Sequence, residues 1–150
     1  MSRHELFLSH ASPNRRFVER LARALKERGV RFFYSKRHIV GARQWHDELG
    51  DALARCDWFV LVLSKASVKS IWVKRELLFA LEASQYRDRI LPVLLEKCAA
   101  DKLSWTLSAF QHIDFTDSFD DGFTALLAAI KTRVRKAARA GTKKKPKRGV

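Results

Sequence analysis

The chain has 150 residues, 47% of them hydrophobic and 31% charged, and a formal net charge of +14. This length fits one globular domain, and the apolar content excludes a chain that is disordered throughout. No run of about 18 apolar residues occurs, which excludes a transmembrane helix. Because it has only two cysteines and a strand-like segment from residue 5, we expect no secretory signal and reduced thiols in the cytoplasm.

The first part of the chain alternates between strand-like and helical periodicity. Strands are predicted over residues 5–8 and 30–34. Between them, residues 14–28 predict a helix, with Gly29 as its C-terminal stop. The apolar stripe of that helix consists of Phe17, Val18, Leu21 and Leu25. Residues 44–56 predict the next helix, whose apolar stripe consists of Trp45, Leu49, Ala52, Leu53 and Cys56.

The middle of the chain contains two nearly continuous apolar runs, over residues 58–63 and 90–95. Such runs are typical of strands covered on both faces of a parallel sheet. A helix is predicted between them, from residue 70 to about 86. Pro92 argues against the second strand unless it lies near a strand start or off the main ladder.

A short strand over residues 112–115 and a last helix after Ser118 complete the predicted elements. The last helix begins with acids and ends with bases, which suits the helix dipole. Residues 131–150 contain ten Lys or Arg and no acid, so residues 1–130 carry 20 bases, 16 acids and a net charge of +4. We therefore expect a domain over 1–135 and a basic, flexible tail over 136–150, which could give nucleic acids only a non-specific, salt-dependent affinity.

Alternating strands and helices predict a doubly wound α/β domain with right-handed crossovers. Ligands of such sheets bind beyond the carboxyl ends of the strands, near the point where strand order reverses. This rule indicates three candidate ligand-binding segments, residues 9–12, 34–41 and 64–70. The six glycines lack the spacing of a dinucleotide-binding GxGxxG or a P-loop, the five histidines lack metal-ligand spacing, and no GxSxG is present. No metal site is expected.

Trp72 and Glu76 are the pair most suggestive of chemistry. They are four residues apart, so they share a helix face that is separate from the core stripe through Val73 and Leu77. An indole can stack on a planar heterocycle, and a carboxylate can hold ribose hydroxyls and stabilise positive charge at an anomeric carbon. The alternative is an amphipathic helix whose Glu76 is solvated or paired with a nearby base.

The order of these segments resembles a TIR (Toll/interleukin-1 receptor) domain of the short bacterial type, over residues 5 to about 135. The matching segments are FLSHAS (7–12), ALKERGV (24–30), RFFYSKRHIVGARQWHDELGDAL (31–53), CDWFVLVLSKASVKSIWVKRELLFAL (56–81) and RILPVLLE (89–96). The resemblance implies a flavodoxin-like five-stranded parallel sheet with helices on both faces. It also implies hydrolysis or cyclisation of NAD⁺ with release of nicotinamide. The alternative is a non-enzymatic module that acts through TIR–TIR contacts.

The resemblance assigns the catalytic role to Glu76. The expected substrate-binding residues lie one turn before it, after the first two strands and at the helix start: Trp72, Ser9, His10, Ala11, Tyr34, Arg37, Trp45 and Ser70. After the aromatic that ends the second strand, the family often has an acid, whereas Ser35, Lys36 and Arg37 follow here. A basic loop suits the diphosphate of NAD⁺.

The resemblance also implies partners and a setting. NAD⁺ is expected as a substrate, with no cofactor and no metal. Self-association through TIR–TIR contacts is expected, as is a separately encoded effector or sensor as a protein partner. No interaction with a membrane is expected. The setting implied is anti-phage defence signalling in a bacterial cytoplasm.

Overall fold

The computed structural model describes the backbone of residues 4–35 and 42–144 and the side chains of residues 4–35 and 46–131. Within this part, five parallel strands form one sheet in the order β2-β1-β3-β4-β5. The strands are β1 (Glu5–Ser9), β2 (Arg31–Tyr34), β3 (Trp58–Leu63), β4 (Ile90–Leu94) and β5 (Ile113–Asp114). This order is the flavodoxin-like one, and it confirms the expected fold class.

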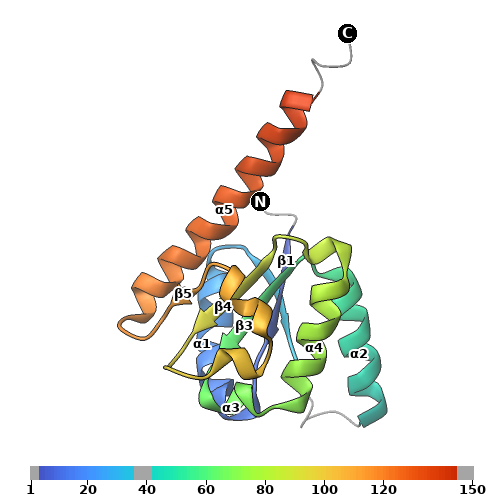
Figure 1. Cartoon of the computed structure of the whole chain (residues 1–150), viewed down its shortest axis with the longest axis vertical. Helices are drawn as coiled ribbons and strands as arrows, with labels where there is room; N and C mark the ends of the chain where they lie inside the picture. Colours follow the sequence, from blue (N-terminus) through green and yellow to red (C-terminus); the bar gives the residue numbers. More distant parts are fainter. Residues whose placement is uncertain (1–3, 36–41, 145–150) are drawn as a thin grey trace.

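Helices connect the strands and cover both faces of the sheet (Figure 1). The α-helices are α1 (Arg15–Glu27), α2 (Ala42–Arg55), α3 (Lys65–Val68), α4 (Ile71–Glu82) and α5 (Phe119–Lys144). Short 3-10 segments are η1 (Ser12–Asn14), η2 (Ser84–Tyr86), η3 (Ala100–Lys102) and η4 (Trp105–Ala109). None of the helices in the described residues combines the length and the hydropathy that a membrane span needs.

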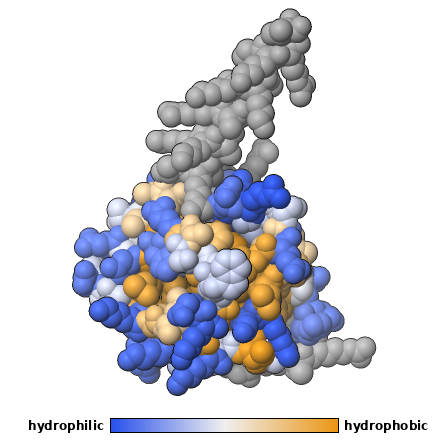
Figure 2. Space-filling model, in the orientation of Figure 1, coloured by the Kyte–Doolittle hydropathy of each residue, from blue (hydrophilic) through white to orange (hydrophobic). Residues whose placement is uncertain are grey.

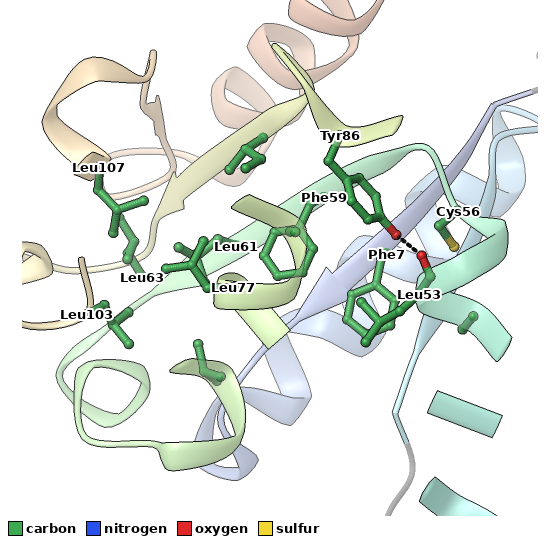
Figure 3. Close-up of a cluster of buried hydrophobic side chains, with 14 of the residues drawn as sticks. Phe7, Leu53, Cys56, Phe59, Leu61, Leu63, Leu77, Tyr86, Leu103 and Leu107 are labelled. Carbon is green, nitrogen blue, oxygen red and sulfur yellow. Dashed lines mark hydrogen bonds between the residues drawn. The ribbon is translucent and has the colours of Figure 1, made fainter. Parts of the chain in front are cut away.

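Two hydrophobic cores lie on opposite faces of the sheet, because successive side chains of a strand point to opposite faces. Phe7 and Phe59 face the core beneath α2 and α4, and their rings stack with centroids 5.6 Å apart. In the same core, the Tyr86 hydroxyl donates to the Leu53 carbonyl at 2.6 Å (Figure 3). The other core, beneath α1 and α5, contains Leu6, Leu8, Val60, Val62, Leu21 and Leu126. The central strands are therefore buried on both faces, as their apolar runs predict.

Pro92 lies inside β4, opposite Leu61 of β3, and not near a strand start. The Leu95 amide donates to Leu63 of β3, whereas the Leu94 carbonyl accepts from Phe115 next to β5. Backbone groups of β4 thus alternate between its two neighbours, and Pro92 faces the β5 side. Pairing with β5 begins only at Val93, so the ladder does not need the missing N–H.

Some predicted boundaries change. The helix predicted from residue 70 to about 86 ends at Glu82, because Ala83 is extended, and η2 follows as a separate turn. The strand predicted over 112–115 has two residues, Ile113 and Asp114. The last helix continues to Lys144, so helical backbone extends nine residues beyond the boundary expected at 135. Gly29 has a φ of 70° just after α1, as a C-terminal stop requires.

Charged side chains gather at the amino ends of the strands. The buried Glu5 carboxylate accepts from Arg31 at 3.0 Å and from Arg55 at 2.9 Å. Hydrogen bonding to Glu5 raises the pKa of Arg55 above its ordinary value. Asp57, just before β3, pairs with His4 and with Arg89, the latter at 2.9 Å. This end of the sheet is therefore held by ion pairs, opposite to the end where ligands of such folds bind.

Candidate functional site

Ser9 and Glu76 meet at the carboxyl end of the sheet. Ser9 is the last residue of β1, which lies between β2 and β3, and Glu76 lies in α4. The Ser9 hydroxyl donates to Glu76 Oε1 at 2.7 Å, and both residues are buried, with exposed fractions of 1% and 3%. A carboxylate held in this way lies where strand order reverses, which is where the topology predicts a ligand.

Glu76 is more buried than its helix position predicts. We expected it on the Trp72 face, apart from the core stripe, but it is buried together with Val73, Leu77 and Ala80. The physical reason is that α4 packs on β1, so the buried face of the helix is wide enough to include position 76. The predicted alternative of a solvated Glu76 is wrong for this structure.

Trp72 lies one turn before Glu76 and is partly exposed, at 36%. Its ring packs under Arg75, whose Cζ lies 5.1 Å from the ring centroid. A partly exposed indole that already carries a stacked guanidinium is a surface on which other planar groups also stack. Ser70 is the N-cap of α4, and its hydroxyl accepts from the Val73 amide at 3.2 Å. That bond gives Ser70 a structural role at the start of the helix that carries Glu76.

The residues after β1 and at the end of β2 also approach one another. His10 is buried, and its ring meets that of Tyr34 edge to face, with centroids 6.1 Å apart. Ala11 is buried in the core beneath α2 and α4, and its carbonyl accepts from the Asn14 amide at 2.9 Å. Arg37 lies outside the described residues. Trp45 lies in α2, and its side chain is outside the described part.

The chain matches the TIR domain family over residues 6–127. The chain belongs to the TIR domain family. Among curated relatives, it is 32% identical over 93 residues to the "Probable 2' cyclic ADP-D-ribose synthase TcpB" of Brucella abortus (strain 2308), covering 60% of this chain and 37% of that protein. It is 30% identical over 98 residues to the "Stimulator of interferon genes protein" of Magallana gigas, covering 64% of this chain and 24% of that protein. The chain thus spans 37% and 24% of the length of these two relatives.

Solved structures of TIR domains share the fold. The TIR domain of the Toll-related receptor TRR-2 from Hydra magnipapillata has a TM-score of 0.68 and 18% identity, covering 87% of this chain and 97% of that one. A metazoan TIR-STING receptor from C. gigas, solved with 2',3'-cGAMP, has a TM-score of 0.67 and 24% identity, covering 83% and 38%. The TIR domains of the activated Roq1 resistosome have a TM-score of 0.63 and 17% identity, covering 87% and 99%.

Two further residues of this TIR domain connect the loops beside the candidate site: Ser64, the first residue of the candidate segment 64–70, and Asn14, for which the sequence predicts no site role. The Ser64 hydroxyl donates to Asn14 Oδ1 at 2.6 Å, joining the segment after β1 to the segment after β3. Ser64 is also the N-cap of α3, where it forms a capping box with Ser67. A serine that follows an apolar strand and precedes a helix is a recognisable cap signal. The contact with Asn14 leaves no such signal, because the two residues are far apart in sequence.

The described part of this TIR domain has no group of three or more His, Cys, Asp or Glu side chains that could hold a metal ion. At the site, the described groups that offer chemistry are the Glu76 carboxylate, the Ser9 hydroxyl, the His10 ring and the Trp72 indole. A buried carboxylate with an adjacent partly exposed indole fits a cationic transition state next to a planar group.

Proposed function

We propose that this TIR domain breaks the bond between nicotinamide and ribose in NAD⁺. The observation that carries the proposal is the buried Glu76 carboxylate, held at 2.7 Å by Ser9 at the carboxyl end of β1. The likeness to the relative named "Probable 2' cyclic ADP-D-ribose synthase TcpB" supports the same chemistry. NAD⁺ is the substrate here, and the proposed reaction needs no separate cofactor.

In the proposed reaction the electron pair of the C–N bond leaves with the nicotinamide ring nitrogen. Nicotinamide departs neutral, so no general acid is needed, and positive charge develops at the anomeric carbon and the ring oxygen of ribose. The Glu76 carboxylate stabilises this charge and accepts hydrogen bonds from the ribose hydroxyls. Trp72 stacks on one of the two bases, and Ser9 fixes the carboxylate.

The group that attacks the anomeric carbon of the ribose decides the product. Water gives ADP-ribose and releases a proton. A ribose hydroxyl of the same molecule gives a cyclic product and also releases a proton, whereas an adenine nitrogen gives a cyclic product in which the attacking ring carries the positive charge or loses a proton. A second small molecule as acceptor gives a conjugate. We place this chemistry in a defence signalling pathway in the cytoplasm, where a separately encoded protein detects the product.

The test is product analysis by mass spectrometry after purified protein is incubated with NAD⁺ at high protein concentration with a crowding agent. Glu76→Gln keeps the size of the side chain and removes its charge, and Glu27→Gln on the exposed face of α1 is the matched control. We expect nicotinamide release by the wild type and the control and not by Glu76→Gln. Equal release by Glu76→Gln would contradict the assigned role, and the second product identifies the acceptor.

A non-enzymatic module that acts through TIR–TIR contacts is the second candidate. The observation that favours it is the exposed apolar surface of α4, which includes Ile71 at 54% and Leu78 at 48% exposure. Absence of turnover both in the purified protein and in cells under phage challenge would favour this candidate.

A further inference from the structure

Helix α5 is longer than the sheet that it covers. Ile130 is the last described side chain of α5 in the core that it shares with α1, whereas the helical backbone continues to Lys144. Figure 1 shows this last part projecting past the sheet, at the end opposite to α3. Because α3 follows the carboxyl end of β3, the projecting part lies away from the end where Ser9 and Glu76 meet. We call residues 131–144 the α5 extension.

The α5 extension is strongly basic. It contains seven Lys or Arg and no acid, and no acid follows Asp121 in the sequence. Residues 1–130, in contrast, carry a net charge of only +4. Figure 2 shows the hydrophilic surface of the domain interrupted by apolar surface on the side that it displays. Half of the net charge of +14 is therefore concentrated on one projecting helix.

The helical register gathers four of these bases in one row. Ala128 and Lys131 are exposed and mark the outer side of α5. Steps of four residues from Lys131 lead to Arg135, Arg139 and Lys143, so these positions follow one another along the helix. Consecutive positions are separated by about 6 Å along the helix axis. We call these four residues the basic row.

The basic row requires a source of negative charge. Like charges four residues apart destabilise an isolated helix, and the α5 extension has no acid to offset them. The apolar stripe of α5 ends here as well, because Arg133 stands two turns after the buried Leu126. A helix with neither an apolar stripe nor balanced charges is not stable by itself. A polyanionic partner would supply the missing stabilisation.

The composition of the α5 extension distinguishes between polyanions. A helix that lies on a membrane needs large apolar residues on one face, and Val134 is the only one here. Proteins hold single-stranded nucleic acids by stacking bases on aromatic side chains, and the extension contains none. A duplex presents about one phosphate charge per 1.7 Å of its axis. Seven bases along about 21 Å of helix complement this dense, regular charge without any stacking.

We propose that the α5 extension binds the sugar-phosphate backbone of a nucleic-acid duplex through the basic row. Contacts with phosphates carry no sequence information, so the binding is independent of base sequence. The helical backbone distinguishes this site from the flexible tail expected over 136–150, because a helix fixes the spacing of its charges. The interaction does not depend on the proposed NAD⁺ chemistry, which lies at the other end of the sheet.

Fluorescence anisotropy of the full chain with a labelled DNA duplex tests the basic row. The affinity is measured from about 50 to about 200 mM salt. Replacing the four residues of the row by glutamine is expected to weaken binding at least about a hundredfold at low salt. The slope of log affinity against log salt is expected to become shallower by about 3, because each neutralised phosphate contributes about 0.9. Glutamine has nearly the helix propensity of Lys and Arg, so the variant changes charge and not helix formation.

The matched control makes the same change in net charge on the domain. It replaces four exposed bases by glutamine, and its affinity is expected to stay within about threefold of the wild type. These four residues are Lys69, Arg87, Lys97 and Lys102. An equal loss in the control and in the basic-row variant would show that overall charge alone drives binding, and it overturns the proposal.

A proline variant separates the helix from its charge. Ala138→Pro keeps every base, but its ring clashes with the carbonyl of Val134 and interrupts the helix. We expect it to bind the duplex about tenfold more weakly than the wild type, because the row loses its fixed spacing. Circular dichroism is expected to show helix content rising when the wild type binds the duplex, and rising less in Ala138→Pro. Unchanged affinity in Ala138→Pro contradicts the helical site.

Three further probes test the choice of partner. An oligo-dT strand of the same length and vesicles containing phosphatidylserine are both expected to bind at least about tenfold more weakly than the duplex. Equal or tighter binding of either one overturns the assignment. An RNA duplex of the same sequence presents the same phosphate chemistry, and the tighter of the two duplexes identifies the source. No binding of either duplex at low salt overturns the proposal. Glu76→Gln is expected to bind as the wild type does, so each outcome leaves the NAD⁺ proposal to its own test.

Discussion

The Ser9 hydroxyl, at the end of the first strand, donates to the Glu76 carboxylate over 2.7 Å, although the two residues are 67 positions apart. The bond joins β1 to α4 at the only charged residue on the buried face of that helix. A buried carboxylate is costly unless its oxygens are hydrogen-bonded. Ser9 therefore stabilises the fold and fixes the group that we assign to catalysis.

Replacing Ser9 by alanine is expected to affect both stability and turnover. Loss of a hydrogen bond to a buried charged group lowers the free energy of unfolding by about 1.5–3 kcal/mol. Turnover of NAD⁺ is expected to fall about ten- to a hundredfold, because the carboxylate is no longer held in one geometry. Urea denaturation and initial rates measure the two effects. Combining Ser9→Ala with Glu76→Gln completes a double-mutant cycle, and additive stability losses in that cycle would contradict the coupling.

The link between Asn14 and Ser64 gives a graded prediction. Ser64→Ala removes the bond to Asn14 and also the cap that accepts from the Ser67 amide at 3.0 Å. Asn14→Ala removes only the first of these. We expect Ser64→Ala to lower the free energy of unfolding by about 2 kcal/mol and Asn14→Ala by about 1 kcal/mol. Chemical denaturation measures the difference, and equal losses would mean that the cap contributes nothing.

The ion pairs of Glu5 are expected to differ in their contribution. Arg55 meets both Glu5 oxygens, whereas Arg31 meets one, and the two arginine side chains are 48% and 61% exposed. Because solvent screens both arginines, we expect losses in unfolding free energy of about 1–2 kcal/mol for Arg55→Ala and about half of that for Arg31→Ala. Arg15→Ala, which breaks an exposed pair with Glu19, is the control and is expected to change little. The reverse order of the two losses would contradict the geometric argument.

The buried thiol of Cys56 predicts lower stability at alkaline pH. Burial raises the pKa of Cys56 from its ordinary value near 9 to about 12. Below pH 9 the thiol is protonated in both states. Above pH 9 the unfolded chain loses this proton while the folded chain keeps it, so the free energy of unfolding falls as pH rises towards about 12, by at most about 1.4 kcal/mol per pH unit.

Urea titrations at neutral and at alkaline pH measure this slope. Cys56→Ala is expected to make it shallower, leaving a part due to Tyr86, whose pKa burial also raises. Cys98→Ala is the control, because Cys98 is less buried and burial raises its pKa less far. If Cys98→Ala flattened the slope as much as Cys56→Ala, the assignment to Cys56 would be wrong.

The sequence predicts the elements that depend on burial and periodicity and misses those that depend on distant neighbours. The run over residues 58–63 predicts β3 with its observed bounds, because a strand buried on both faces needs apolar residues throughout. The segments η3 and η4 are too short to show a period. Glu76 could be singled out because it follows Trp72 by four residues in the sequence. Its burial, however, depends on the packing of α4 on β1, and its partner Ser9 is recognisable only when the sheet is assembled.

The position of β1 between β2 and β3 has a consequence for how the protein folds. β1 pairs with β2 on one side and with β3 on the other, and it supplies Leu6 and Phe7 to opposite cores. Neither core can close until the chain has been synthesised beyond Leu63, and the Ser9–Glu76 bond needs a further helix. Because such non-local pairing is slow, β1 and β2 are expected to remain uncommitted until β3 has been synthesised, and to fold with the later elements in one cooperative step.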